Sequence, residues 1–363
     1  MGEYGFLLKR LSNQVFFQKR KHLLMKDIQL FDISRFRAEH MGWAMVFIIL
    51  FHIHLPQSDP FFGLRRMGNI GVDIFLLLSG IGLWFSWTKN TMSSSDCFLR
   101  KWVGFYWRRL KRIYPAWIVV TSLYYIPKFL SKEMHTLREW IDLFGDILIN
   151  WDFWLHDELT FWYVPAIMML YVFAPPYMEL VRRHPLYKWL VVMAVVWCVI
   201  VQYVSPIHHA LGHIEIFWSR IPIFFLGINI ADGIKKKETI EGNAIWMIVV
   251  FFVVCLATCV WLEQMRHGKF PLFLERMVYI PLTISTVLLL TKVIACSPKW
   301  LNKAMAWIGG ISLEIYLIHY EFVLRPLSHY HLPYWLDFIC VTAIALPLAW
   351  LLQKILGKIT RQK

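Results

Sequence analysis

The sequence predicts an all-α fold, a polytopic membrane helix bundle of about ten transmembrane helices with its N- and C-termini in the cytoplasm. The first observation is composition: 58% of the 363 residues are hydrophobic and 17% are charged, whereas a soluble domain is about half apolar and a quarter charged. A soluble fold of this length would leave much of that apolar surface in water. The second observation is a series of long apolar runs, and the third is the distribution of Lys and Arg between them.

The apolar runs predict the helices in order, since a spanning helix needs roughly 20 mostly apolar residues. The predicted spans are 41–56, 68–88, 115–131, 160–180, 187–204, 216–234, 243–262, 272–292, 304–325 and 334–355. The first and third are short and are expected to extend into their flanks. The chain then divides into a basic cytoplasmic N-terminal segment (1–40), a transmembrane domain (41–355) and a cytoplasmic tail (356–363).

The Lys and Arg residues predict the orientation, because short cytoplasmic loops carry an excess of both. With the N-terminus inside, 28 of the 38 Lys and Arg residues fall on the cytoplasmic side and 10 fall outside or near outer helix ends. The formal net charge of +14 therefore indicates membrane orientation, with no nucleic-acid partner. An odd number of spans would break the alternation between basic loops on the cytoplasmic side and less basic loops on the outer side.

Ionisable groups inside the predicted spans are the first candidates for function, because burying them in lipid is costly. The main ones are His52, Asp73, Arg220, Glu314 and His319. His52 lies toward the outer end of the first span, where a neutral imidazole could take a proton from a hydroxyl and return it. A core histidine bonded to a neighbouring helix would show the same pattern.

Asp73 and Arg220 each have two readings. Asp73 lies in GNIGVDIFLLLSG, early in the second span, and could orient an imidazole as the acid of a triad does, or serve as a structural acid at a Gly-rich helix contact. Arg220 opens the sixth span and is expected to pair with Glu215 or Glu314. His319 is predicted to lie at a depth similar to that of His52.

The cytoplasmic stretch FYWRRLKRIYP is the most specific local signal. It places Arg108, Arg109 and Arg112 just before Pro115, which is expected to open the third span. On a helix Arg109 and Arg112 are neighbours at i, i+3, and two guanidinium groups can hold a phosphate bidentately. That chemistry suits a phosphate-rich cytosolic donor such as a coenzyme A thioester. An ordinary basic cluster on lipid head groups is the alternative.

The predicted outer loop 132–159 combines seven carboxylates with Trp140, Trp151 and Trp154. Tryptophans near a membrane surface usually form an interfacial belt, and Trp beside carboxylates is also typical of a sugar-binding surface. The six cysteines include no C-x-x-C pair, so neither a zinc site nor a disulfide framework is predicted. The outer cluster of His208, His209 and His213 has a spacing that could hold a metal, but it is interpreted as an exposed loop.

Six sequence blocks in order resemble the acyltransferase 3 family of integral-membrane acyltransferases, from about residue 31 to 355. They are the first span ending LFH at His52, then GVDIFLLLSG, FYWRRLKRIYP, FWYVPAIMMLYVFAPP, RIPIFFLGI and GGISLEIYLIH. The resemblance implies an O-acyltransferase, expected to be an O-acetyltransferase, of the inner (cytoplasmic) cell membrane. It would have no permanently bound cofactor, acetyl-CoA or another acyl-CoA as donor, and an extracytoplasmic glycan or glycolipid as acceptor.

The resemblance also assigns residues. His52 matches the catalytic histidine, Arg109 and Arg112 match the R-x-x-R element near the donor site, and Asp73 matches the acid of the G-V-D-x-F block. Arg220 and His319 match recurrent positions. The donor site and His52 must then share one continuous passage through the bundle. Direct transfer and a covalent acyl-histidine relay both remain open.

Two departures from the family pattern stand out. The family carries an Arg eleven residues before its histidine, where this chain has Met41; Arg37, one turn earlier on the same helix face, is a candidate replacement. A Glu pair of many members is replaced by Ile167 and Met168. A transporter or flippase of a polysaccharide precursor is the alternative function, although the paired repeats common in transporters are not visible.

Overall fold

The structure is a computed structural model that describes residues 27–91, 98–132 and 136–361. The helices are α2 (Phe31–Arg35), α3 (Arg37–His52), α4 (Phe62–Arg66), α5 (Ile70–Thr91), α6 (Phe98–Leu130), α7 (Leu137–Ile149), α8 (Trp151–His156), α9 (Tyr163–Arg183), α10 (Leu190–Tyr203), α11 (Ser205–Leu211), α12 (Glu215–Trp218), α13 (Ile221–Lys235), α14 (Ile245–Arg266), α15 (Leu272–Cys296), α16 (Lys299–Gly310), α17 (Ser312–Ile318), α18 (Arg325–Leu327) and α19 (Tyr334–Arg361). A π-helical turn, η5 (His319–Leu324), follows α17. Five short 3-10 turns are η1 (Met67–Asn69), η2 (Pro185–Trp189), η3 (Gly212–Ile214), η4 (Gly242–Ala244) and η6 (Ser328–Tyr330). Strands β1 (Ile28–Gln29) and β2 (Thr239–Ile240) pair antiparallel.

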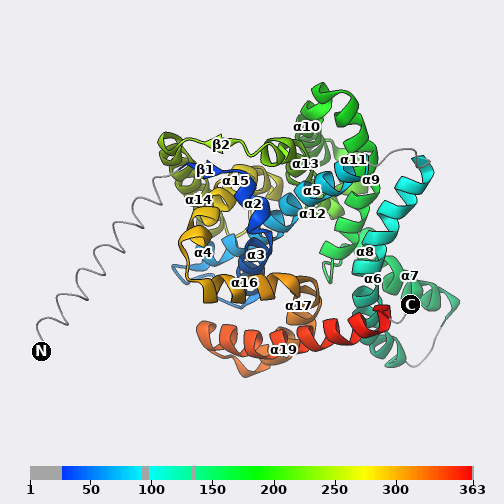
Figure 1. Ribbon diagram of the computed structural model, residues 1–363. Helices are drawn as coiled ribbons and strands as arrows, with labels where there is room; N and C mark the ends of the chain where they lie inside the picture. Colours follow the sequence, from blue (N-terminus) through cyan, green and yellow to red (C-terminus); the bar gives the residue numbers. More distant parts are fainter. Residues whose placement is uncertain (1–26, 92–97, 133–135, 362–363) are drawn as a thin grey trace, which may run out of the picture.

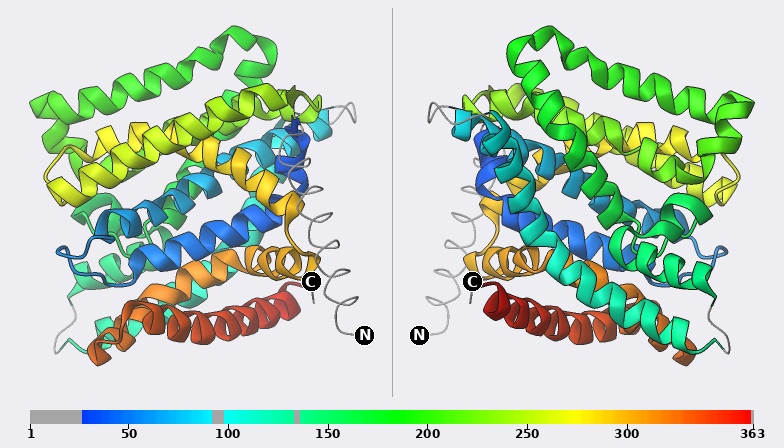
Figure 2. Two further views of the ribbon diagram at one scale, coloured as in Figure 1. Left: turned by 90° about the vertical axis from the view of Figure 1, so that its left-hand side faces the viewer. Right: turned by 90° about the vertical axis from the view of Figure 1, so that its right-hand side faces the viewer.

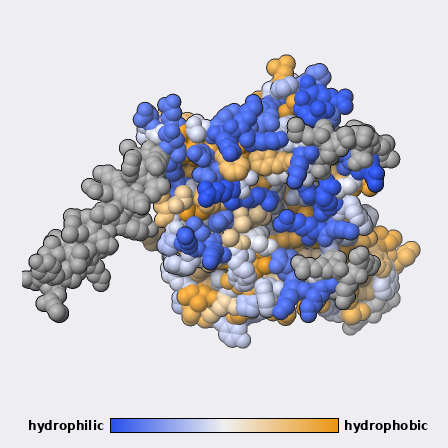
Figure 3. All heavy atoms as spheres, viewed as in Figure 1, coloured by the Kyte–Doolittle hydropathy of each residue, from blue (hydrophilic) through white to orange (hydrophobic). Residues whose placement is uncertain are grey.

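The long helices run side by side in one bundle (Figures 1 and 2). Each predicted span overlaps a helix of this bundle, so the all-α prediction is confirmed. Figure 2 shows that β1 and the end of α19 lie at the same end of the bundle, which is the arrangement an even number of crossings produces. Hydrophilic residues gather across that end face, with hydrophobic residues mostly along its rim (Figure 3).

The helices differ in how well their length and hydropathy fit a membrane crossing. Within the described residues, six helices are long and apolar enough to cross a membrane, or up to seven if the bent pair Ser205–Trp218 and Ile221–Lys235 counts as one span. The other predicted spans depart from a regular apolar helix. Helix α3 has only 16 residues, α6 carries the basic cluster in its first half, and the predicted span 304–325 is broken between α16 and α17. The count of ten and the cytoplasmic side of the termini stay predictions.

Burial separates central from peripheral helices. In the stretch Phe62–Lys89, which contains α5, 83% of the apolar window is buried, against 11% for Pro185–Tyr203 and 11% for Gly242–Arg266. Helices α10 and α14 therefore present most of their apolar side chains to the surroundings, as lipid-facing helices do. Helix α5 lies in the middle of the bundle, beside α3, so residues on these two helices are the ones placed to face an internal passage.

Glycines hold α3 against α16 at backbone contact. A Cβ at Gly42 would lie 2.0 Å from the carbonyl oxygen of Met305, and a Cβ at Gly309 would lie 2.0 Å from that of Ala38. Small residues allow such close helix crossings in membranes. The crossing fixes the first half of α3 against α16. The chain that follows α16 carries the polar residues of the predicted ninth span.

The predicted outer loop contains a surface helix. Helix α7 is amphipathic: Leu137, Ile141, Phe144 and Leu148 are exposed along one face, whereas the opposite face packs against α6. Such a helix lies in the membrane interface with its apolar face toward the acyl chains. The interfacial interpretation of this region therefore has structural support.

Candidate active site

A cavity of about 460 Å³ opens among α3, α5, α6, α9 and α17 and contains the predicted donor residues. Arg37, Met41, Arg109 and Arg112 all line this inner cavity, together with Lys111 and Glu314. Arg37 and Met41 thus face the same space from successive turns of α3, as the replacement hypothesis requires. Arg108 is exposed and does not line the cavity.

The arginines of the inner cavity lack anionic partners. Among the described residues, none of Arg37, Arg109 and Arg112 forms an ion pair, and the buried Nε of Arg37 has no hydrogen-bond partner. Glu314 is the one carboxylate in the lining. Guanidinium groups favour phosphate and carboxylate ligands, which they bind bidentately. This cavity can therefore bind a ligand with several negative charges.

A second cavity, of about 810 Å³, lies toward the other end of α3 and is lined by His52 and His319. Its wall combines carboxylates, arginines and aromatic rings. The carboxylates are Asp157, Glu158, Glu215 and Glu321, the arginines are Arg66, Arg276 and Arg325, and the rings include Phe51, Trp162 and Tyr320. Polar groups around aromatic faces suit a hydroxyl-rich ligand. Of the three tryptophans singled out in the outer loop, none lines this outer cavity; Trp140 stacks on Phe144 and Trp154 packs against Phe217.

The inner and outer cavities adjoin each other. Ile48, Val72 and Tyr316 line both of them. Arg37 and His52 stand at opposite ends of α3, roughly 22 Å apart at 1.5 Å per residue. The guanidinium cluster and the imidazole therefore lie in neighbouring cavities, which these three side chains separate.

The two histidines form a hydrogen-bonded pair. The Nδ1 of His52 lies 2.8 Å from the carbonyl oxygen of Ile48 and 3.3 Å from the Nε2 of His319. The Nδ1 of His319 lies 3.0 Å and 2.9 Å from the carbonyl oxygens of Ile315 and Tyr316. Carbonyl oxygens only accept, so both Nδ1 atoms carry the proton and the Nε2 of His319 is an acceptor. The pair thereby leaves the Nε2 of His52 unprotonated and able to act as a base.

Asp73 lies in an ion pair with Arg220, and not against His52. Arg220 donates to the Asp73 carboxylate and, over 3.1 Å, to the side-chain oxygen of Asn69, and both charged side chains are almost fully buried. The expected pairing of Arg220 with Glu215 or Glu314 is therefore wrong. The reason is topological: α5 and α13 pack along their lengths and bring together residues 147 positions apart. The orienting contacts of His52 come from the Ile48 carbonyl and His319.

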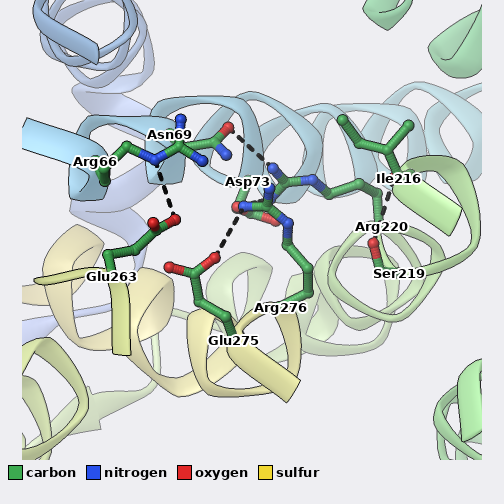
Figure 4. Close-up of polar contacts among 9 residues, drawn as sticks. All are labelled: Arg66, Asn69, Asp73, Ile216, Ser219, Arg220, Glu263, Glu275 and Arg276. Atoms are coloured by element: carbon green, nitrogen blue, oxygen red, sulfur yellow. Dashed lines mark hydrogen bonds and ion pairs between the residues drawn. The ribbon is translucent and has the colours of Figure 1, made fainter. Parts of the chain in front are cut away.

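A buried network of ion pairs surrounds Asp73 and Arg220 (Figure 4). Arg66 donates to Glu263 over 3.1 Å, and Arg276 lies 3.8 Å from Glu275; both arginines line the outer cavity. None of these residues was among the candidates predicted from the sequence. The signal was present, because Glu275 and Arg276 stand together inside an apolar run, where paired charges mark functional or structural networks.

No group of three or more His, Cys, Asp and Glu side chains is placed to hold a metal ion within the described ranges. His213, the last of the outer histidine cluster, instead contacts the carbonyl oxygen of Trp154 through Nε2, at 2.9 Å. The polar groups that the structure gathers are those of the two cavities.

The profile of the acyltransferase domain family matches residues 42–354, which is most of the chain and includes most of the residues that line the two cavities. The chain belongs to the acyltransferase 3 family. This membrane acyltransferase is also similar to the regulator of hypoxia-inducible factor 1 from Caenorhabditis elegans, with 29% identity over 150 residues that cover 36% of this chain and 29% of the worm protein. The acyltransferase thus spans less than a third of that relative. No solved structure matches it significantly.

Proposed function

We propose that this acyltransferase transfers an acyl group from a cytosolic acyl-CoA to a hydroxyl of a glycan or glycolipid on the opposite side of the membrane. Acetyl-CoA is the expected donor, and the inner cell membrane is the expected location. The observation that supports the proposal is the pair of adjoining cavities: guanidinium groups without ion pairs line one cavity, a histidine pair lines the next, and both cavities share three wall residues.

The inner cavity would bind the donor by its phosphates. Arg109 and Arg112 come from one face of α6, and Arg37 comes from α3. The guanidinium of Arg109 stacks over the ring of Phe105 at 5.0 Å, which restricts its orientation. With the phosphates at this level, the thin pantetheine arm would extend along the passage and place the thioester near His52.

His52 would act as the general base. Its Nε2 takes the proton of the acceptor hydroxyl while the hydroxyl oxygen attacks the thioester carbon. The carbon–sulfur bond then breaks, and the imidazolium returns the proton to the departing thiolate, which leaves as free coenzyme A. The Nδ1–H of His52 stays hydrogen-bonded to the Ile48 carbonyl, with the Nε2 of His319 as a second acceptor, and the two acceptors stabilise the imidazolium. A relay through an acyl-histidine uses the same nitrogen as nucleophile.

The outer cavity would hold the acceptor. Carboxylates accept hydrogen bonds from sugar hydroxyls, and an aromatic ring stacks on the C–H faces of the sugar ring. Asp157, Glu158 and Trp162 supply both kinds of group within one wall of the outer cavity. The Nε2 of His52 is the base available to a hydroxyl placed there.

The test is donor turnover by the purified protein with labelled acetyl-CoA and a polysaccharide or glycolipid acceptor. His52→Ala is expected to lower acyl transfer by about 10²- to 10⁴-fold, the contribution of a general base. His54→Ala is the matched control, because His54 is exposed and does not line the outer cavity. Transfer by His52→Ala at the rate of the His54→Ala control would reject His52 as the base, and no donor-dependent product from the wild-type protein would reject the function.

A further inference from the structure

The wall that the two cavities share is built from three side chains on three different helices. Ile48 comes from α3, Val72 from α5 and Tyr316 from α17. A thioester that passes from the inner to the outer cavity has to pass between them. Ile48 and Val72 are 1% and 5% exposed, so they are packed into the bundle, and the partly exposed Tyr316 completes the partition.

Two of the three side chains in this partition lie on closely packed helices. Helices α3 and α5 touch at Gly71, where an added Cβ would lie 2.3 Å from the carbonyl oxygen of Ala44 and 2.8 Å from Cγ1 of Ile48. Backbones packed at this distance move as one unit. Ile48 and Val72 are thus buried side chains on two helices in backbone contact, so the third side chain, on the short helix α17, is the one freest to change the width of the partition.

Tyr316 has the features of a movable wall. Helix α17 has seven residues, begins after the break at Ile311 and is followed directly by the π-helical turn η5, a feature often found at functional sites. The ring of Tyr316 packs against the rings of Tyr163 and His319, with centroids 5.3 Å and 6.0 Å away. Rotation of one aromatic side chain can therefore open the partition without moving a long helix.

One hydrogen bond holds this side chain in place. The backbone N–H of Tyr163 donates to the hydroxyl of Tyr316 over 3.1 Å. Tyr163 is the first residue of α9, and the first N–H groups of a helix have no partner within it. The residue before it, Trp162, lines the outer cavity. This hydrogen bond, which we call the latch of Tyr316, is therefore adjacent to the surface that an acceptor would contact.

We propose that Tyr316 is the gate between the donor and acceptor cavities, latched by the N–H of Tyr163 and released when an acceptor occupies the outer cavity. This inference rests on the proposed function. In its closed position the gate keeps outer water from the thioester. Without it, water takes the place of the acceptor: its oxygen bonds to the thioester carbon, the carbon–sulfur bond breaks, and the water proton passes through His52 to the thiolate. The products are a free carboxylic acid and coenzyme A.

The gate is tested by release of coenzyme A thiol from acetyl-CoA without acceptor. Tyr316→Ala is expected to raise this release at least 10-fold, and His52→Ala in the same background is expected to remove the increase. Tyr316→Phe keeps the ring and loses only the latch, so a rise of about 2- to 10-fold is expected, the effect of one neutral hydrogen bond. The Phe variant decides the question alone if the Ala variant does not fold.

Tyr177 supplies the matched control. Its ring is buried, and its hydroxyl also makes a single hydrogen bond, donated to Asn229 over 2.8 Å, but it lines neither cavity. Tyr177→Ala and Tyr177→Phe should leave acceptor-free thiol release at the wild-type rate. If the wild-type protein transfers acyl groups while Tyr316→Phe and Tyr316→Ala release no more thiol than the Tyr177 variants, the gate is rejected and the proposed function stands. If the wild-type protein neither binds nor turns over acyl-CoA, the proposed function itself has failed.

Discussion

The proposed base is oriented by a second histidine where a triad would use a carboxylate. A buried carboxylate beside His52 would have to be desolvated, and that cost is large in the membrane interior. The Nε2 of His319, 3.3 Å from the Nδ1 of His52, accepts the same hydrogen bond without a permanent charge. Asp73, the carboxylate predicted to orient the base, instead neutralises Arg220.

His319→Ala is therefore expected to lower kcat about 10²-fold, because the Nδ1–H of His52 keeps only the Ile48 carbonyl as an acceptor, while the KM for acyl-CoA changes little. His319 lines only the outer cavity, which is why donor binding should persist. His319→Asn, whose amide oxygen can still accept, should recover part of the rate. Steady-state kinetics with varied acyl-CoA would measure both constants, and a wild-type kcat in His319→Ala would show that the contact has no positioning role.

The arginines of α6 allow a comparison within one basic cluster. Arg109→Ala with Arg112→Ala should weaken coenzyme A binding by at least 10-fold, since each charge-assisted hydrogen bond contributes about 1.5–3 kcal/mol. Arg108→Ala should bind as the wild type does, because Arg108 is exposed beyond the cavity. Calorimetric titration of coenzyme A would measure the Kd of each variant. Equal Kd values for the double variant and Arg108→Ala would indicate a general surface-charge effect.

At the scale of elements, the interrupted segment after α16 supplies polar groups to the inner cavity, to the shared wall and to the outer cavity. Glu314 lines the inner cavity, Tyr316 lines both cavities, and His319 lines the outer one. The break at Ile311 and the π-helical turn redirect these side chains inward. Such irregular backbone is tolerated at membrane depth only where protein or a cavity surrounds it.

The sequence predicted the helices better than the partners of their polar residues. Apolar runs located every long helix, because lipid burial is a local property of the chain. Helix α6 begins at Phe98, well before the predicted start at Pro115, since hydropathy marks the lipid boundary and not the end of the helix. The pairing of Asp73 with Arg220, and of His52 with His319, depends on which helices pack together. No spacing in the sequence encodes that information.

The hairpin of α7 and α8 has a titratable contact at its turn. Asp146 is buried on α7 and accepts the backbone N–H of Asp152 over 2.8 Å. Burial is the main cause that raises the pKa of Asp146 to about 7, and the nearby Asp152 charge also raises it. The folded hairpin then binds more protons than the unfolded segment between pH about 4 and pH about 7, so its stability falls as pH rises through that window.

Asp146→Asn should remove this pH dependence. Hydrogen exchange of the α7 and α8 amides, corrected for intrinsic rates, would report the opening free energy at pH 5 and pH 8. In the wild-type protein protection is expected to be lower at pH 8 by a few kcal/mol at most, whereas the Asn variant should be protected equally at both. The same loss of protection in both proteins would exclude Asp146 as the titrating group.

At the scale of the whole molecule, the proposed reaction requires a fixed sidedness. Strands β1 and β2 and the end of α19 lie at one end of the bundle (Figure 2). The inner cavity is lined by Arg37, the first residue of α3, and by Gly357 near the end of α19, whereas His52 is the last residue of α3. An acyl-CoA pool on one side and an acceptor on the other can be joined by one passage only if the guanidinium cluster faces the cytosol. The distribution of Lys and Arg predicts that orientation.

Single cysteines in a cysteine-free background would establish the sidedness. Gln57 follows α3 at its His52 end and is exposed, and Lys237 precedes β2 and is exposed. In sealed right-side-out vesicles, a membrane-impermeant maleimide should label Gln57→Cys without further treatment. Lys237→Cys should be labelled only after permeabilisation. A tag placed after Lys363 should likewise become accessible only after permeabilisation. Labelling of the tag together with Gln57→Cys would mean an odd number of crossings. Labelling of Lys237→Cys from outside would place the arginines on the wrong side of the membrane for a cytosolic thioester, and the donor assignment would fail with it.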